Sequence, residues 1–266
     1  MRLYKSNFAW LFLGFCITLL FLPGLPFSSN LTQTNHDQQL FIPKNSGYVV
    51  SPIIINGNSG WFPLASSEPW CTGSGTSGSP YIIENITIDA QGIDNCIEII
   101  GSSLNFIIRN CTFLNSGTRG GFGGDAGIRL ESVNNGKIID CRITNNGNDG
   151  IFMRFCNNII IKNNTISNND MYGLHSGDYN TNTDSSFDIS NNTFEDNYMD
   201  DVHMGQAWYV DFSSNYFSSG VGILLSGFNK FINNTFNNAN LKIEYSEHNE
   251  IIQSIFTQYS SYFVRG

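Results

Sequence analysis

The sequence predicts an all-β solenoid, in which short strands wind into stacked rungs. A short frame recurs eight times, and successive copies lie 25, 30, 23, 28, 23, 19 and 20 residues apart. Each copy has an apolar residue five places before its last residue and a polar residue three places before it. Such a repeat is typical of solenoids, whose units complete their core by stacking. The last residues of the copies, here called the anchors, are Ile88, Phe113, Ile143, Ile166, Phe194, Phe217, Phe236 and Phe256.

The first 26 residues are predicted to be a signal peptide or an N-terminal membrane anchor, in the form of a hydrophobic helix. Arg2 and Lys5 precede an apolar run over residues 8–22, which is the pattern of a targeting segment. The run is short for a bilayer span and no clear cleavage site follows it, so cleavage and anchoring both remain open. We therefore expect an exported chain, secreted or anchored at the cell surface, that meets the membrane only through this segment.

The rest of the chain is predicted to be a polar linker, residues 27–47, followed by one β-helix domain, residues 48–266, with clear repeats over 81–256. Each copy contains a second strand before the anchor strand, with alternating apolar residues that bury one face. Trp61 and Trp70 are expected to cover the open end of the stack. The second strands are seen at residues 96–99, 127–130, 150–153, 201–204 and 222–225.

The position two before the anchor predicts a ladder of stacked side chains. Because like residues of stacked rungs form columns, asparagines at this position can bond from rung to rung. Cys111 and Cys141 head the column, either as stacked thiols or as a disulfide. The column reads Ile86, Cys111, Cys141, Asn164, Asn192, Asn215, Asn234 and Ser254.

Charge and cysteine usage exclude some functions. The chain has a net charge of -9, and removing Arg2 and Lys5 takes two positive charges away to leave -11. No basic cluster remains, so nucleic acid is not an expected partner. No Cys or Cys/His group has zinc spacing.

The frames at residues 109–113, 162–166 and 232–236, each near a Gly-Ile strand, resemble the right-handed parallel β-helix repeat family. The resemblance covers about residues 81 to 256 and implies a single-stranded right-handed parallel β-helix of eight rungs or more. That superfamily includes pectate lyases and other polysaccharide-acting proteins, and its short-repeat members include NosD-like periplasmic accessory proteins of copper enzymes. The segment 73–86 is similar to the entry of exported archaeal β-helix surface proteins. This resemblance is specific for the fold and weak for function.

Candidate site residues are sought where the repeat is interrupted. The outward positions of the second strands form a column in which two histidines fall on adjacent rungs, and Asp201 replaces the glycine of neighbouring rungs. Arg129, Phe152, His175 and His203 are therefore candidate ligand-binding residues, and His175, His203 and Asp201 are candidate metal ligands. The predicted column is Glu98, Arg129, Phe152, His175, His203, Leu224 and Lys242.

Arg142, Asp140 and Asp201 are the candidate catalytic residues. Arg142 interrupts a column of threonines just before the anchors, where it either holds a uronate or sulfate group or pairs with Asp140 or a neighbouring acid. The acids of the chain do not reproduce the calcium-binding motif of pectate lyases. Glu131 and Arg154 are expected to form a surface salt bridge.

The long loops at residues 114–126 and 175–186 are either surface insertions or walls of a site.

These observations support three hypotheses about function. The first is an exported, non-catalytic β-helix that binds a polysaccharide or a cell-surface partner. The second is a carbohydrate-active lyase, hydrolase or epimerase acting on an acidic polysaccharide. The third is a NosD-like accessory role in copper handling, suggested by the repeat type and the two histidines. No cofactor is firmly implied, and calcium or copper would be the metals under the second and third hypotheses.

Overall fold

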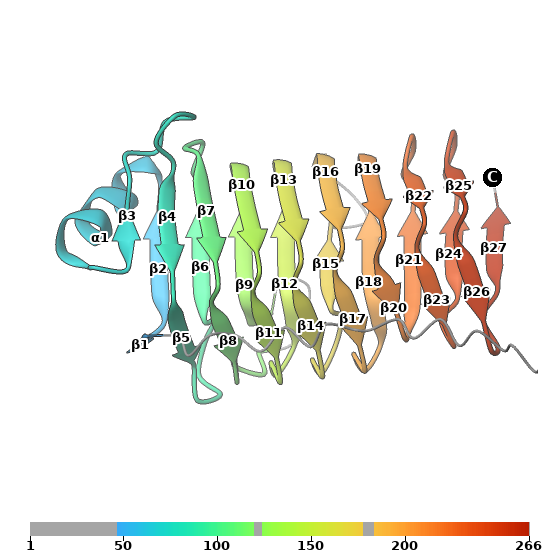
Figure 1. The fold of residues 1–266 in the computed structure, drawn as a ribbon, viewed down its shortest axis with the longest axis horizontal. Helices are drawn as coiled ribbons and strands as arrows, with labels where there is room; N and C mark the ends of the chain where they lie inside the picture. The colour runs from blue at the N-terminus through green and yellow to red at the C-terminus, as the bar shows by residue number, and fades with distance from the viewer. Residues whose placement is uncertain (1–46, 120–123, 178–183, 266) are drawn as a thin grey trace, which may run out of the picture. The chain divides into compact units, whose positions relative to one another are not determined.

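The structure, a computed structural model, describes residues 47–119, 124–177 and 184–265. These residues form three nine-stranded sheets, and successive rungs follow one another along one axis (Figure 1). Each full rung contributes one strand to each sheet, and all pairings but one are parallel. The chain is therefore a parallel β-helix, as its repeat predicts. The predicted N-terminal hydrophobic helix and most of the predicted linker lie outside the described residues.

Sheet A contains the anchors, which pair with one another from rung to rung. Val50 pairs with Ile88 and adds a rung before the first predicted copy. The strands of sheet A are β1 (Tyr48–Val50), β5 (Ile86–Asp89), β8 (Thr112–Leu114), β11 (Arg142–Thr144), β14 (Thr165–Ser167), β17 (Thr193–Glu195), β20 (Tyr216–Phe217), β23 (Thr235–Asn237) and β26 (Ile255–Thr257).

Sheet B contains the predicted second strands and carries the candidate histidines on its outer face. The strand β27, which the repeat did not indicate, extends this sheet by one member. The strands of sheet B are β2 (Ile53–Asn56), β6 (Ile97–Ile100), β9 (Ala126–Glu131), β12 (Asp149–Arg154), β15 (Leu174–Ser176), β18 (Asp200–Gly205), β21 (Gly220–Leu224), β24 (Leu241–Glu244) and β27 (Tyr262–Arg265).

Sheet C contains the apolar residues five places before the anchors, again paired in register. Its first strand, β3, pairs antiparallel with β4. The strands of sheet C are β3 (Cys71–Thr72), β4 (Tyr81–Glu84), β7 (Phe106–Arg109), β10 (Asn134–Ile139), β13 (Asn157–Lys162), β16 (Asp184–Ser190), β19 (Ala207–Ser213), β22 (Lys230–Ile232) and β25 (Glu250–Ile252).

The polar residue of each frame forms the corner between sheets C and A. In all eight copies this residue has a φ between 50° and 59°, the left-handed conformation that Asn and Asp adopt more readily than other non-glycine residues. This requirement explains why the position is polar in every copy. The residues are Asn85, Asn110, Asp140, Asn163, Asn191, Ser214, Asn233 and Gln253.

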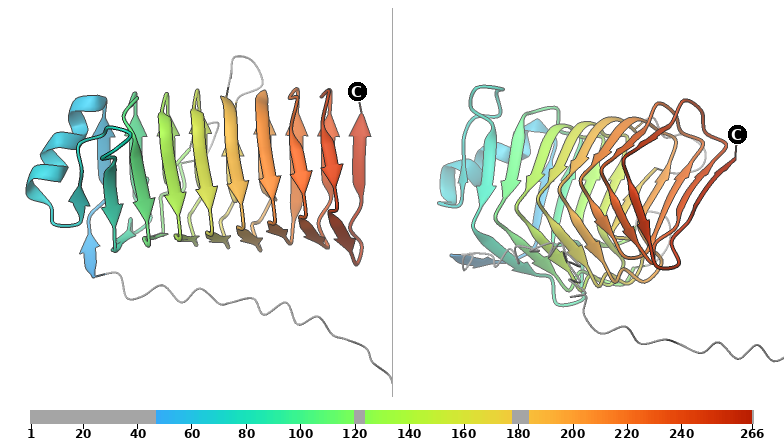
Figure 2. Two further views of the ribbon diagram at one scale, coloured as in Figure 1. Left: turned by 45° about the horizontal axis from the view of Figure 1, so that its top comes forward. Right: turned by 45° about the vertical axis from the view of Figure 1, so that its right-hand side comes forward.

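One end of the stack is covered by a short helix, α1 (Trp61–Ser67), which follows the 3-10 turn η1 (Asn58–Gly60) (Figure 2). The Trp61 side chain is fully buried and stacks on Tyr81 with ring centroids 5.1 Å apart. Trp70 is also buried. The expected cover by the two tryptophans is confirmed, whereas α1 itself was not predicted, because seven residues are too few to show a helical period.

The predicted amide ladder runs through the core beside the anchors. The Oδ1 atoms of Asn192, Asn215 and Asn234 each accept two hydrogen bonds, from the backbone N–H and the Nδ2 of the asparagine one rung earlier. The first donor in this series is Asn164. The Ser254 hydroxyl ends the column by accepting from the backbone of Asn234. The cysteines that head it, Cys111 and Cys141, are buried free thiols, and burial raises the pKa of Cys141.

A second amide ladder, which the sequence analysis did not find, follows the anchors. Asn146 donates to Asn169 Oδ1 at 2.9 Å, and Asn169 donates to Asn197 Oδ1 at 2.8 Å. The ladder ends where Asn197 donates to Asp201 Oδ1 at 2.8 Å. The carboxylate of Asp201 therefore stands where another asparagine would continue the column.

Candidate functional site

The candidate site lies on the outer face of sheet B, in a column here called the histidine face. Strand pairing places its members in register on successive rungs, as predicted, up to His203. The prediction for the next rung was wrong. The register shifts between Asp200 and Val202, so that Gly222 pairs with His203 and Leu224 pairs with Gly205. The histidine face therefore consists of Glu98, Arg129, Phe152, His175, His203, Gly222 and Lys242.

The histidine face is not an open surface in its middle rungs. Phe152 is only 1% exposed and His175 is 6% exposed. The Phe152 and His175 rings meet edge to face, with their centroids 5.3 Å apart. The Arg129 guanidinium lies over the Phe152 ring, 4.8 Å from its centroid. The predicted ligand-binding residues Arg129 and Phe152 therefore support the histidines, and neither faces open solvent.

A buried carboxylate holds the first histidine. Asp149 Oδ2 lies 2.8 Å from His175 Nδ1, and both side chains are almost fully buried. Asp149 Oδ1 accepts a hydrogen bond from the backbone N–H of Tyr172 at 3.2 Å. Because a carboxylate at Nδ1 fixes the orientation of an imidazole, His175 is held in one position on the face.

Tyr172 joins the two histidines. Its ring stacks on His203 with centroids 4.8 Å apart and planes 25° apart, and it lies 4.8 Å from the His175 ring at a steeper angle. The two imidazoles themselves are 5.6 Å apart, edge to face. Burial, reinforced by His175, lowers the pKa of His203 to about 4. The imidazole of His203 is therefore neutral at physiological pH.

A pocket of about 390 Å³ opens beside His203. Gly222 belongs to its lining, and a Cβ atom at this position would lie 3.4 Å from His203 Nδ1. Asp200 enters the pocket over Gly220, where a Cβ atom would come within 1.9 Å of the Asp200 Oδ1 atom. The lining is mostly polar and consists of Asp200, Ser218, Ser219, Gly220, Val221, Gly222, Asn238, Asn240 and Lys242.

The first rungs of the histidine face carry a chain of ion pairs. Arg129 binds both Glu98 and Glu131 at 3.0 Å, and Glu131 also binds Arg154. The predicted pair of Glu131 and Arg154 is thus confirmed. Because the Arg129 side chain is only 12% exposed, this network is less screened by solvent than an isolated surface pair.

The described ends of the loop at residues 114–126 lie close to these ion pairs. Arg119 binds Asp94 at 2.9 Å and Asp125 at 2.6 Å. The backbone carbonyl of Gly124 accepts a hydrogen bond from Arg129. The centre of this loop and most of the loop at residues 175–186 lie outside the described residues.

Asp201 does not join the histidines. Its Oδ1 accepts from Asn197, and its Oδ2 accepts from the backbone N–H groups of Ser218 and Ser219 at 2.7 and 2.8 Å. The proposed set of His175, His203 and Asp201 is therefore not assembled as a metal site, because both carboxylate oxygens of Asp201 already accept hydrogen bonds at the corner between sheets A and B. Among the residues that the structure describes, no group of three or more His, Cys, Asp or Glu side chains is arranged to hold a metal ion.

Arg142 and Asp140 also lie apart from the histidine face. Arg142 is exposed on sheet A, where it replaces threonine between Thr112 and Thr165. Asp140 forms the left-handed corner of the same rung. Within the described ranges no ion pair joins the two, so the expected pairing does not form.

Two residues of the site, Asp149 and Tyr172, escaped the sequence analysis. Each directly precedes a glycine of sheet B: Gly150 lies within β12, and Gly173 lies directly before β15. They therefore occupy equivalent positions on adjacent rungs, with His175 beside them. Comparing this position across the copies would have found the pair.

The geometry defines a class: a parallel β-helix with a polar site on the outer face of one sheet. A family model described as the right handed beta helix region matches residues 126–264, just over half of the chain. The protein therefore belongs to this family, and the predicted right-handed β-helix is confirmed. Among curated proteins no sequence matches the chain.

Three solved structures show a partial likeness to the chain. The chain is 14% identical to the A-module of the mannuronan C-5 epimerase AlgE4 of Azotobacter vinelandii, with a TM-score of 0.41 over 70% of this chain and 64% of that one. It is 14% identical to the Dettilon tailspike protein, with a TM-score of 0.42 over 68% of this chain and 45% of that one. It is 11% identical to the tailspike protein gp49 of the Acinetobacter baumannii phage Fri1, a capsular polysaccharide depolymerase. The TM-score is 0.35, over 82% of this chain and 62% of that one. The chain thus spans less than two thirds of each, and the likeness concerns the fold alone.

In the described part of the chain no helix is long and apolar enough to span a bilayer. The predicted N-terminal segment lies outside that part.

Proposed function

We propose that the protein is an exported β-helix that binds a polysaccharide on the histidine face. The observation that carries this proposal is the polar pocket beside His203. Its hydroxyl, amide, carboxylate and ammonium groups offer both donors and acceptors, which suits a ligand rich in hydroxyl groups. The Tyr172 ring stacked on His203 adds an aromatic surface to the histidine face.

The solenoid supports the same proposal through its shape. Strands of sheet B repeat about every 4.8 Å along the axis, so a bound polymer can meet equivalent positions on several rungs. Export is supported by the basic and apolar start of the sequence. A chain of this kind would meet its ligand outside the cytoplasm.

Filling the pocket is expected to weaken binding while the fold persists. In Gly222→Leu, the new Cβ makes only an ordinary contact with His203 Nδ1, and the rest of the side chain occupies the pocket. We expect binding of polysaccharides in a glycan panel, measured by calorimetry, to weaken at least about tenfold. The control is Gly78→Leu, where a Cβ meets nothing within 4 Å. Equal affinity of the two variants, with thermal unfolding unchanged, would show that the ligand does not enter this pocket.

Acid–base catalysis on the bound saccharide is the second candidate function. It is favoured by the neutral imidazole of His203, whose Nδ1 atom lies next to the lining residue Gly222, and by the Asp149–His175 pair on the preceding rungs. A neutral imidazole within reach of a substrate proton can act as a general base. Copper handling gains no comparable support, because among the described residues no group of three or more His, Cys, Asp or Glu side chains is arranged to hold a metal ion.

The His203→Gln variant separates catalysis from binding. If His203 is a base, release of unsaturated or shortened sugars from acidic polysaccharides will fall at least about a hundredfold, because general base catalysis contributes factors of this order. Glutamine keeps a hydrogen-bonding side chain, so affinity in the calorimetric assay should change little. Wild-type protein that binds a polysaccharide without any product would leave binding as the function.

A further inference from the structure

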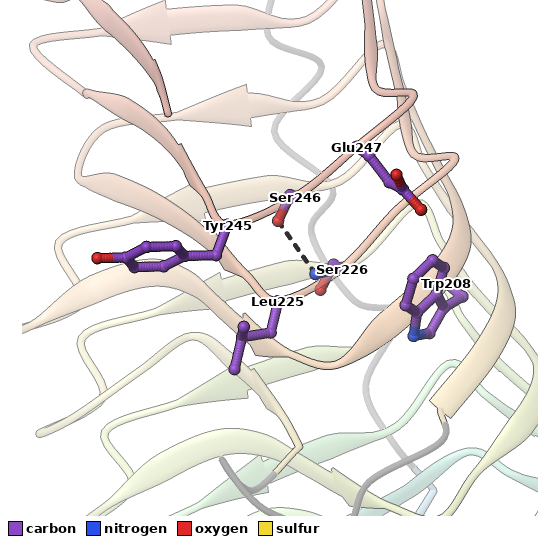
Figure 3. A pocket seen from close by; sticks show the side chains of 6 residues that line it. All are labelled: Trp208, Leu225, Ser226, Tyr245, Ser246 and Glu247. Atoms are coloured by element: carbon purple, nitrogen blue, oxygen red, sulfur yellow. Dashed lines mark hydrogen bonds between the residues drawn. The ribbon is translucent and has the colours of Figure 1, made fainter. Parts of the chain in front are cut away.

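A second recessed site shares no lining residue with the pocket of the histidine face and lies at the corner between sheets B and C (Figure 3). Trp208, Gly227 and Glu247 are equivalent residues of three successive rungs, joined by isolated parallel bridges. The recess has a volume of about 580 Å³. Its walls come from Trp208, Leu225, Ser226, Tyr245, Ser246 and Glu247.

The position of the indole depends on a glycine one rung later. A Cβ atom on Gly227 would lie 2.7 Å from Trp208 Cζ3, so the indole occupies the space that a side chain at residue 227 would take. The indole of Trp208 therefore lies along the corner and is only half buried. It forms one side of the recess with Glu247, and Leu225 and Tyr245 project on the other side (Figure 3).

The floor of the recess is rigid, because its serines are already hydrogen-bonded. The Ser226 hydroxyl accepts from Ala207 N at 3.0 Å and donates to the carbonyl of Leu224 at 2.8 Å. The Ser246 hydroxyl accepts from Ser226 N and donates to the carbonyl of Glu244 in the same way. A ligand would therefore be bound by the walls.

Bulky residues occupy left-handed corners around the recess, at positions that are left-handed on other rungs too, as at Ser132 and Asn158. Leu225, Phe228 and Tyr245 have φ angles of 52°, 56° and 50°, a region in which large side chains are rare and costly. Their rings and chains are also substantially exposed. Phe228 stacks between Tyr209 and His248 at 5.1 and 4.6 Å. Exposed apolar groups held at such a cost are typical of binding sites.

Two polar groups at the recess are available to a ligand. The Glu247 side chain is 66% exposed, and its nearest ionisable neighbour is His248 at 3.8 Å. The indole N–H of Trp208 donates to no atom of the described residues. The recess thus combines apolar walls with one strong acceptor and one donor.

We propose that this corner binds a neutral hexopyranose unit of a glycan. The C–H groups on one face of a pyranose can pack on the negative face of the indole, while adjacent hydroxyls donate to Glu247 and accept from the indole N–H. The volume lies within the usual range for small-ligand sites. A quaternary ammonium ion would match the rings and the carboxylate, but it would leave the indole N–H without an acceptor. This inference does not depend on the histidine face.

The test uses the intrinsic fluorescence of the full chain carrying Trp10→Phe. Trp61 and Trp70 are buried, so a change in emission on titration reports on Trp208. The probes are the methyl pyranosides of glucose, galactose and mannose, with tetramethylammonium chloride as the competing chemistry. Ligand-observed saturation-transfer NMR measures the same binding in variants that lack Trp208.

We expect at least one methyl hexoside to perturb Trp208, and its affinity to fall about tenfold in Trp208→Ala. Gly227→Ala should have a similar effect, since it displaces the indole but keeps every functional group. Gly222→Leu should leave the signal unchanged, which separates this site from the histidine face. Tyr198→Ala removes an 83% exposed ring elsewhere and is the matched control. The proposal is overturned if no hexoside binds, if only tetramethylammonium binds, or if Trp208→Ala binds like wild type.

Discussion

Replacing Asn192 by alanine is expected to lower the free energy of unfolding by about 4 kcal/mol. The Asn192 side chain lies in the middle of the first amide ladder and is 1% exposed. Its Oδ1 accepts from the backbone N–H and the Nδ2 of Asn164, and its Nδ2 donates to the carbonyl of Ile161 and to Asn215 Oδ1. Alanine would leave several of these buried groups without partners and would open a cavity.

Urea unfolding followed by circular dichroism measures this loss. The control is Thr193→Ala, which changes the adjacent residue on the half-exposed outer face of sheet A. It removes no buried hydrogen bond and should cost less than about 1 kcal/mol. Equal losses in the two variants would mean that the ladder contributes no stability of its own.

Replacing Asp201 by alanine is expected to cost about 4 kcal/mol at pH 4 and clearly less at pH 7. The variant removes the acceptor for Asn197 and for the backbone N–H groups of Ser218 and Ser219. Burial raises the pKa of Asp201 from 3.8 to about 6, against the lowering effect of these hydrogen bonds. The folded state therefore holds a proton here between pH 3.8 and pH 6, where the unfolded state has lost it.

The sign of the pH effect follows from that proton. The contribution of Asp201 to stability is fully present below pH 3.8 and declines as the pH rises through 6, because ionisation of a buried carboxyl opposes folding. The difference in unfolding free energy between wild type and Asp201→Ala should thus shrink by up to about 3 kcal/mol from pH 4 to pH 7. Asp188→Ala, an exposed acid on sheet C, is the matched control. A difference that grows with pH would contradict the assignment.

The sequence predicted the rungs well because their register depends on local requirements. Apolar anchors, a left-handed polar corner and stackable amides recur in every copy and can be read without knowing the fold. The position of Leu224 could not be read in the same way, because the register shift between Asp200 and Val202 leaves the apolar pattern of β21 intact. A slip of this kind changes which residues are neighbours and leaves no mark in the periodicity.

The candidate site was predicted only in part for a similar reason. His175 and His203 were found because they share a column, whereas Asp149 reaches His175 from a different column of the preceding rung. Asp201 was predicted as a metal ligand and catalytic residue because a carboxylate in place of glycine is compatible with either a chemical or a structural role. Its role became clear only with the second ladder, where Gly150 and Gly173 leave room for Asn169 and Asn197. On the rung after Asp201 the corresponding residue is Gly220, whose missing side chain leaves room for the carboxylate of Asp200.

The adjacency of rungs has a consequence for how such a chain can change over generations. Duplicating or deleting one whole rung preserves every column, since each rung contacts only its neighbours. The contacts of His175 with Asp149 and with His203, however, exist only because β12, β15 and β18 follow one another without interruption. One rung inserted between β15 and β18 would separate the two imidazoles by a further 4.8 Å or so while leaving the scaffold sound. Length can therefore drift freely at other rungs, and these three form a block that must be inherited whole.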